Sequence, residues 1–400
     1  MVPNPYTPGE LPRYLAGRGE ELGVLRRYLA RVRAYGEMAG PPLVLHGPRG
    51  VGKTSLMRAA LDDARADGFV AAWISCAKGQ PFLRDLADSV GRALEDAEVE
   101  ITRPWQTRLS RVGIELGMTG PKVSAELTTG RARRAELRAG SVSALEELLH
   151  VAAVALRDRG GAGLVLAIDE LHAAPQPEVA VLLNAAQNLA GDRTSNPVAV
   201  LGAGLPAVRG TLTRAATFGE RSRWLDVRLL DQNDAADLLV HPAAELGVRW
   251  EPAAVAHLVE HASGYPYFLQ VLGDQTWEQA RPRAGDRIGV DHARAGAVAA
   301  ADQLRSLHVA RWEAATAGER AFLAAMAAIG GDGPVARAAI ARRLGVESRS
   351  LSDVRNRLLD KAIIEPADRG SVRFTVPGFA RHVLAEAADV APGPPDTSGH

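Results

Sequence analysis

The chain has 400 residues, of which 46% are hydrophobic and 24% are charged, and its formal net charge at pH 7 is zero. This length exceeds what a single hydrophobic core usually organises, and it predicts two or three domains. The balanced charge excludes a general electrostatic attraction to nucleic acid or to an anionic membrane, so a partner of either kind must bind a local patch.

The N-terminal residues carry several prolines and no apolar core of the length found in signal peptides. We expect residues 1–13 to form a flexible N-terminus. No stretch of the sequence approaches the roughly 18 to 20 apolar residues of a membrane-spanning helix, which predicts a cytoplasmic protein without a membrane partner. The single cysteine, Cys76, lies in an apolar run and is expected to be a buried, unreactive thiol.

A glycine-rich loop follows the first apolar run, at residues 43–46, and precedes a pattern of helical periodicity. Its glycines let the backbone approach a ligand closely, Lys53 supplies a positive charge, and Thr54 supplies a hydroxyl for magnesium. The order of strand, loop and helix predicts a P-loop that binds the phosphates of ATP or GTP with Mg²⁺, rather than an ordinary glycine turn. The predicted nucleotide-binding loop consists of Gly47, Pro48, Arg49, Gly50, Val51, Gly52, Lys53, Thr54 and Ser55.

Five short apolar runs alternate with helical periodicity between residue 41 and about residue 228. Such runs predict a parallel sheet flanked by helices, and we assign residues 14–229 to one α/β core. Around residues 108–130, apolar and polar residues alternate on either side of a turn-like segment, which predicts a β-hairpin insertion. The expected strands of the sheet are 43–46, 69–75, 164–168, 198–202 and 224–228.

Two acidic residues follow the third expected strand. Asp169 would lie at the carboxyl end of that strand and hold magnesium through water. Glu170 would orient and deprotonate the attacking water, so that the γ-phosphate is displaced in line. The alternative is a helix-capping acid, which is common at strand ends, but the position downstream of a P-loop favours the catalytic role.

The fourth expected strand ends at residues 202–206 without a polar side chain, next to the expected phosphate site. Either the backbone there contacts the nucleotide, or a phosphate sensor is missing and hydrolysis is slow, or the segment is a simple tight turn. Arg221 and Arg223 are candidate arginine fingers, because a guanidinium on the transferred phosphate accelerates the reaction about 10³-fold or more. We prefer Arg221, with surface charge as the alternative, and assign catalytic roles to Glu170, Lys53 and Arg221.

Residues 230–312 have the pattern of helices only and predict a helical lid beside the sheet. Asp231 and Asp234 predict a helix N-terminus, residues 252–262 predict a second helix, and Pro266 is well placed in the first turn of a third. Residues 313–388 begin with the capping box of Thr316 and Glu319. They continue with helices expected at 335–344 and about 350–361, and with a small hairpin of strands 363–366 and 372–376. This order is typical of a winged helix-turn-helix, while residues 389–400 should be disordered.

Several motifs in a fixed order carry a family resemblance: residues 16–22, the P-loop, and residues 168–170, 202–206, 264–270 and 374–377. From residue 14 to about 385 the chain resembles bacterial AAA+ ATPases related to replication initiators and to the STAND signalling ATPases. The resemblance implies that Arg18 lies near the adenine. It also implies that Pro266 brings the lid to the nucleotide, so that lid closure distinguishes ATP from ADP.

The choice of ATP over GTP follows from the same resemblance, since the sequence has no guanine-reading Asn-Lys-x-Asp stretch. Two departures from the family pattern predict slow turnover and leave nucleotide binding intact. The third lid helix has no arginine at its start, and the fourth strand has no polar sensor.

The predicted winged helix has a basic surface that would fit double-stranded DNA. Over residues 331–381, ten Arg and Lys face six Asp and Glu, a net charge of +4. The first hypothesis is therefore an ATP-dependent DNA-binding switch. The alternatives are a signalling or scaffold ATPase whose winged helix contacts protein, with or without self-assembly, and a plain nucleotide-binding module. The candidate DNA contacts are Arg349, Arg355, Arg357, Lys361 and Arg369.

Overall fold

The computed structural model describes residues 1–99, 130–191, 196–368 and 370–390. It divides into two compact units: a first unit of Met1–Gly17, Pro48–Val51 and Arg228–His400, and a second unit of Arg18–Gly47 and Gly52–Val227. Each unit has its own hydrophobic core, and the two cores share no residue. The expected hairpin insertion at 108–130 lies, except for Gly130, outside the described residues, as does the C-terminal tail beyond residue 390.

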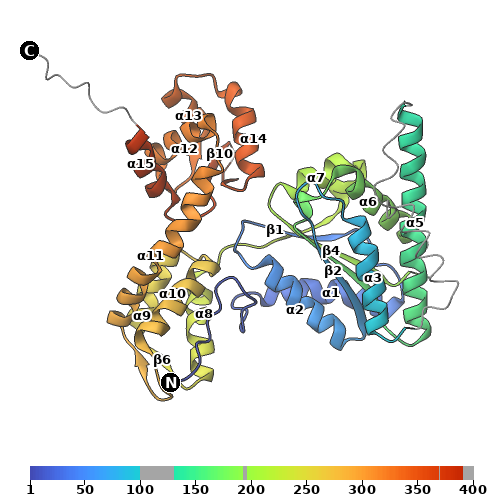
Figure 1. Cartoon of the computed structure of the whole chain (residues 1–400), viewed down its shortest axis with the longest axis horizontal. Helices are drawn as coiled ribbons and strands as arrows, with labels where there is room; N and C mark the ends of the chain where they lie inside the picture. The colour runs from blue at the N-terminus through green and yellow to red at the C-terminus, as the bar shows by residue number, and fades with distance from the viewer. Residues whose placement is uncertain (100–129, 192–195, 369, 391–400) are drawn as a thin grey trace, which may run out of the picture. The chain divides into compact units, whose positions relative to one another are not determined.

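The second unit is built on a five-stranded parallel sheet with the strand order β2-β3-β4-β1-β5 (Figure 1). All five expected strands are confirmed. The expected limits of the first two strands are those observed, and β4 runs two residues beyond its expected end. The strands are β1 (Leu43–His46), β2 (Phe69–Ser75), β3 (Gly163–Asp169), β4 (Val198–Gly204) and β5 (Arg223–Asp226).

Helices cover both faces of this sheet, which explains why its central strands β3 and β4 are buried along their whole length (Figure 1). Successive strand side chains point to opposite faces, so Val44 joins the core beneath one set of helices, whereas Leu43 and Leu45 face the other set. One face carries α1 (Gly19–Tyr35) and α2 (Lys53–Ala66). The other carries α3 (Leu83–Asp96), α5 (Gly130–Asp158), α6 (Gln176–Gly191) and α7 (Val208–Ala215).

In the first unit, the residues that follow Arg228 form a group of four helices. Asp231 caps the first of them, because its carboxylate accepts a hydrogen bond of 2.8 Å from the Asp234 amide. A two-stranded parallel pair, β6 (Arg249–Trp250) with β7 (Arg287–Ile288), corrects the expectation of helices only, since strands of two residues leave no alternating pattern in the sequence. The helices are α8 (Gln232–Glu245), α9 (Pro252–Ala262), α10 (Pro266–Ala280) and α11 (Val290–Glu313).

The N-terminal segment packs into the core of the first unit, where we had expected a flexible chain. Tyr6 is 3% exposed and meets Trp250 and Trp277 edge to face. Its hydroxyl donates to the Leu239 carbonyl and accepts a hydrogen bond of 2.9 Å from Trp250 Nε1. A single aromatic residue among prolines has no periodicity, so the sequence pattern did not indicate this burial.

The C-terminal part of the first unit combines helices with a three-stranded antiparallel sheet of order β8-β10-β9 (Figure 1). The expected helix at 335–344 begins with a short strand, and the one expected near 350–361 is a 3₁₀ turn followed by an α-helix. The elements are α12 (Ala317–Gly330), β8 (Val335–Ala336), α13 (Arg337–Leu344), η4 (Ser348–Leu351), α14 (Ser352–Asp360), β9 (Ile364–Pro366), β10 (Ser371–Phe374) and α15 (Phe379–Val390). Within the described ranges, no helix combines the length and the apolar character that crossing a bilayer requires.

Candidate functional site

The glycine-rich loop lies between the end of β1 and the start of α2. Gly52 has a φ of 93°, a conformation that favours glycine, and the next residue, Lys53, opens the helix. The Lys53 ammonium donates a hydrogen bond of 3.0 Å to the Gly47 carbonyl, and the residue is only 7% exposed. A positive charge and the amide groups of a helix N-terminus therefore meet in one loop, which suits a phosphate group.

The two expected metal ligands lie together. Thr54, in the first turn of α2, donates a hydrogen bond of 2.7 Å from Oγ1 to Oδ2 of Asp169. Asp169 ends β3 and is 5% exposed, and its other carboxylate oxygen accepts a hydrogen bond of 2.8 Å from the Glu170 amide. A hydroxyl and a carboxylate oxygen at this spacing are the hard oxygen donors that Mg²⁺ prefers, so these residues fit the ion that a P-loop uses.

Glu170 sits at the turn after β3 with a left-handed backbone, φ 52°. Its Oε2 lies 3.5 Å from Nε2 of His172, a residue of the short turn η1 (Leu171–Ala173). Nδ1 of His172 accepts a hydrogen bond of 3.3 Å from the Leu205 amide, which assigns the proton of the neutral ring to Nε2, the atom facing Glu170. Sequence reasoning missed His172, and the signal that was available is its place two residues after the acidic pair.

The glycines at the end of β4 have a packing explanation. A Cβ on Gly202 would lie 2.9 Å from the Leu171 side chain, and one on Gly204 would lie 2.9 Å from Val208 Cβ and 3.3 Å from the His172 amide nitrogen. The turn that follows β3 packs closely against β4, so β4 has no room for a polar side chain of its own. The polar side chain at its end comes instead from His172.

A second positive group stands at the same edge of the sheet. Arg209 of α7 lies with Nη2 2.9 Å from Nε2 of His46, the residue just before the glycine loop, and its guanidinium covers the Trp224 ring at 4.8 Å. Burial and the charge of Arg209 lower the pKa of His46, which keeps the ring neutral. The sequence did not indicate Arg209.

Arg221, the expected arginine finger, is exposed in η3 (Thr217–Arg221) and forms no ion pair with any described residue.

The single cysteine lies beside the acidic residues. Cys76 follows β2 and is 6% exposed, and its amide donates a hydrogen bond of 2.9 Å to the Asp169 carbonyl. Burial and the nearby carboxylates, Asp169 foremost, raise the pKa of its thiol to about 12. The thiol is therefore protonated at neutral pH and takes no part in nucleophilic chemistry.

Arg18, expected near the adenine, and Pro266, expected to bring the lid to the nucleotide, lie in different units. In the second unit, Arg18 is 4% exposed and pairs with Glu21 at 3.1 Å. In the first unit, Pro266 opens α10, and the preceding Tyr265 donates its hydroxyl proton to the Arg49 carbonyl. A Cβ on Gly50 would lie 2.9 Å from the Tyr265 hydroxyl oxygen, so glycine is required beneath this ring.

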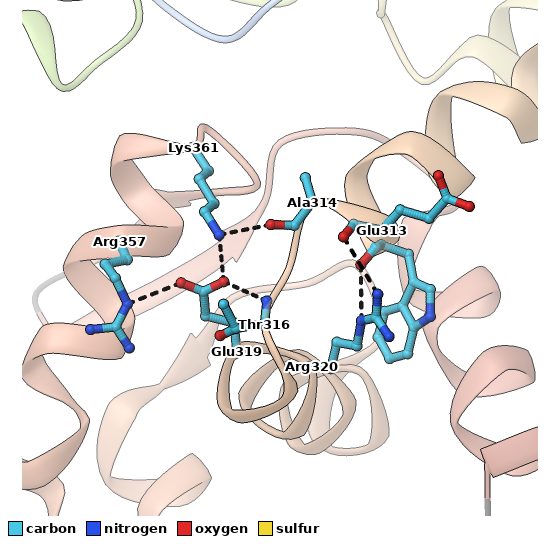
Figure 2. Close-up of polar contacts among 8 residues, drawn as sticks. Glu313, Ala314, Thr316, Glu319, Arg320, Arg357 and Lys361 are labelled. Atoms are coloured by element: carbon cyan, nitrogen blue, oxygen red, sulfur yellow. Dashed lines mark hydrogen bonds and ion pairs between the residues drawn. The ribbon is translucent and has the colours of Figure 1, made fainter.

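The five candidate DNA contacts divide into separate groups. Arg357 Nε lies 3.1 Å and Lys361 Nζ 2.6 Å from the carboxylate of Glu319, which is completely buried (Figure 2). The Thr316 amide donates to the same carboxylate at 2.8 Å, so this ion cluster joins the start of α12 to α14. Arg349 is exposed and Arg355 is partly buried, while Arg369 lies outside the described residues.

Comparisons with known proteins agree with this geometry. Residues 14–201 match the family described as the AAA ATPase domain, and residues 305–383 match a domain of unknown function (DUF8462). No curated protein sequence matches the chain.

Two solved structures have a similar fold. A Walker-type ATPase of Pyrococcus abyssi has a TM-score of 0.57 and 17% identity, over 93% of this chain and 96% of that one. The ORC2 protein of Aeropyrum pernix, solved in ADPNP and ADP complexes, has a TM-score of 0.59 and 15% identity, over 96% of both chains. Residues 14–201 are therefore similar in sequence to an AAA ATPase domain, and the chain shares its α/β fold with these two structures.

Proposed function

We propose that the chain binds ATP with Mg²⁺, hydrolyses it slowly to ADP, and uses the bound nucleotide as a conformational switch. The observation that carries this proposal is the contact of 2.7 Å between Thr54 and Asp169, beside a buried Lys53. Lys53 and Thr54 open α2, whereas Asp169 ends β3 far away in the sequence, and an ordinary glycine turn would not require Thr54 and Asp169 to meet. The match of residues 14–201 to an AAA ATPase domain supports ATP as the nucleotide.

Each site residue has a distinct role in this proposal. The amides of the loop at residues 47–55 surround the phosphates, and Lys53 turns its ammonium from the Gly47 carbonyl to the terminal phosphate. Thr54 and Asp169 hold the Mg²⁺, which, when bound, neutralises charge on the phosphate oxygens. Glu170 accepts the proton of the attacking water.

Slow hydrolysis is proposed because β4 carries no polar sensor side chain and the start of α10 carries no arginine. Arg221 remains a candidate arginine finger, and Arg209, fixed by His46 and Trp224 beside the start of the loop, is a second candidate. Either arginine, Arg221 or Arg209, would supply a guanidinium fork that suits phosphate oxygens.

Arg18 and Pro266 are proposed to contact the adenosine part of the nucleotide, which would let the lid respond to ATP and ADP differently.

Two substitutions test the nucleotide site. Lys53→Ala removes the ammonium that neutralises the phosphates, and we expect no detectable ATP binding by calorimetry in the presence of Mg²⁺. Glu170→Gln removes the base alone, and we expect ATP affinity within about twofold of the parent and a hydrolysis rate at least about 10²-fold lower. Glu95→Gln, at an exposed position of α3, is the matched control and should change neither quantity. Parent-like turnover in Glu170→Gln would show that another group is the base.

We also propose that residues 313–388 form a winged helix that contacts double-stranded DNA. Three helices, α12 to α14, with the antiparallel sheet β8-β10-β9, support this assignment, as does the net charge of +4 over residues 331–381. Binding of random duplex DNA at low salt, measured by mobility shift with ATP and with ADP, tests it. Lack of salt-dependent binding in both nucleotide states would favour the alternative, in which the domain contacts protein or a second copy of the chain.

A further inference from the structure

One pair of arginines in the C-terminal part of the first unit lies beside serine hydroxyls. Arg337 opens α13, and its guanidinium donates hydrogen bonds from Nε to Ser348 Oγ at 3.0 Å and from Nη1 to Ser352 Oγ at 3.4 Å. Its backbone amide donates to the Gly370 carbonyl at 3.1 Å. The side chain is therefore held at the start of α14, while the backbone of Arg337 is bound to Gly370, just before β10.

The second arginine is Arg355 of α14. It follows Ser352 by three residues, and helix residues with this spacing lie on the same face. The side chain is partly buried, burial lowers the pKa of Arg355, and the nearby charge of Arg337 lowers it further. Neither arginine forms an ion pair with a carboxylate of the described residues, although Glu347 and Asp353 are close in sequence.

Three other basic side chains of the same region pair with carboxylates, whereas Arg342, Arg343 and Arg349 are exposed to water. Arg357 and Lys361 share the buried Glu319, and Arg373 pairs with Glu365 at 2.6 Å. The chain thus neutralises these charges and leaves two neighbouring guanidinium groups without a counter-charge from the described residues. Like charges partly removed from water raise the free energy of the folded state, and a bound anion offsets this cost.

We propose that Arg337 and Arg355, with the hydroxyls of Ser348 and Ser352, bind a phosphate group of the backbone of double-stranded DNA. Guanidinium forks and hydroxyls are the usual donors to backbone phosphates, and a guanidinium can bind two phosphate oxygens at once. The site lies at the start of α14, and the N-terminal residues of a recognition helix are those that meet the duplex in helix-turn-helix domains. The inference rests on the proposed DNA contact of this domain, and it replaces Arg357 and Lys361 by Arg337 as the principal contact.

The test compares Arg355→Gln with Arg357→Gln in the full chain. Arg355 has no acidic partner among the residues that the structure describes, so its loss should leave folding intact. Binding of a fluorescent random duplex is measured by anisotropy over a salt series. We expect Arg355→Gln to bind roughly tenfold more weakly at low salt and to reduce the slope of log K against log salt by about one. Arg357→Gln should keep the parent slope, because Glu319 engages that side chain. Equal slopes for the parent and Arg355→Gln would overturn the proposal.

A second measurement uses inorganic phosphate as the probe, in a Lys53→Ala background so that the P-loop does not compete for it. At constant ionic strength, replacing chloride by phosphate should raise the Tm more with Arg355 than with Gln at that position. Stabilisation by phosphate without any duplex binding would overturn DNA as the source of the phosphate. ATP hydrolysis of Arg355→Gln, measured in parallel, should equal that of the parent, so that failure of this inference and failure of the nucleotide site give different results.

Discussion

At the scale of single residues, the candidate site divides into a part that the sequence predicts and a part that only folding brings together. Lys53 and Thr54 directly follow the glycine loop, and Asp169 ends an apolar strand, so the local sequence pattern identifies all three. His172 and Arg209 depend on partners in other elements, namely the Leu205 amide and the His46 ring. No local pattern reports such partners, because the strand order that creates them is set by packing of the whole sheet.

The contact between His172 and Glu170 leads to a prediction about catalysis. A donor on the Glu170 carboxylate fixes its orientation, so His172→Ala should lower kcat roughly tenfold and leave the Kd for ATP unchanged. His172→Gln places an amide donor near the position of Nε2 and should restore much of the rate. His172→Asn places an oxygen near Nδ1, which retains the bond from Leu205 alone, and should not restore it.

Steady-state hydrolysis with calorimetric ATP binding separates these three variants. The reverse result, rescue by Asn and not by Gln, would show that His172 serves only to hold the end of β4.

At the scale of elements, predictability follows the length and regularity of the pattern. The strands β2 and β3 are continuous apolar runs, and α9 begins at a proline, so their limits were predicted closely. The start of α14 was not predicted closely, because the preceding residues, Ser348–Leu351, form a 3₁₀ turn whose composition resembles a helix start. The capping box of Thr316 and Glu319 was visible in the sequence, but the use of the same carboxylate by α14 was not.

The buried Glu319 predicts how the stability of the C-terminal elements depends on pH. Burial raises the pKa of Glu319, but hydrogen bonds from Lys361, the Thr316 amide and Arg357 outweigh this effect and lower the pKa to about 2, from an ordinary value of 4.5. A carboxyl whose pKa falls on folding stabilises the folded state at pH values above its pKa in the unfolded chain. This stabilisation is lost as the pH falls from 4.5 to about 2. With a reduction for the solvent around Arg357 and Lys361, the contribution at pH 7 is about 2 kcal/mol.

Glu319→Gln preserves the shape of the side chain and removes its charge. Urea unfolding should show the variant about 2 kcal/mol less stable at pH 7, with a difference that shrinks steadily below pH ~4.5. A difference that stays constant down to acid pH would mean that packing, rather than charge, makes Glu319 important. Arg357→Gln, which leaves Lys361 on the carboxylate, should lose less stability than Glu319→Gln.

At the scale of the whole molecule, the chain has two hydrophobic cores that share no residue. Composition and length predicted more than one domain, and the change from alternating strands and helices to helices only located the change of core near residue 228. The sequence did not predict that the N-terminal segment belongs to the core of the later residues. Tyr6 reaches Trp250 and Trp277 across more than 240 positions, and such a distant contact leaves no trace in local periodicity.

Separate cores predict two thermal transitions in calorimetry. Tyr6→Ala removes a buried aromatic side chain at a cost of about 3 kcal/mol, and it should lower only the transition of the first unit. Excess MgATP should raise the transition of the unit that contains Lys53, Thr54 and Asp169. Tyr35→Ala, at a residue that is 69% exposed, should shift neither transition. If Tyr6→Ala lowered both transitions equally, the two cores would have to unfold as one.

The surroundings of Cys76 also have a practical consequence for measuring motion. A buried thiol with its pKa raised to about 12 reacts very slowly with maleimide dyes near neutral pH. The wild-type background is thus almost free of label without any substitution. Cysteines introduced at Tyr35 and Val298, which are 69% and 77% exposed, would carry a donor and an acceptor fluorophore, one on each unit. Energy transfer between the two dyes would then follow, in real time, how nucleotides change the separation of the units.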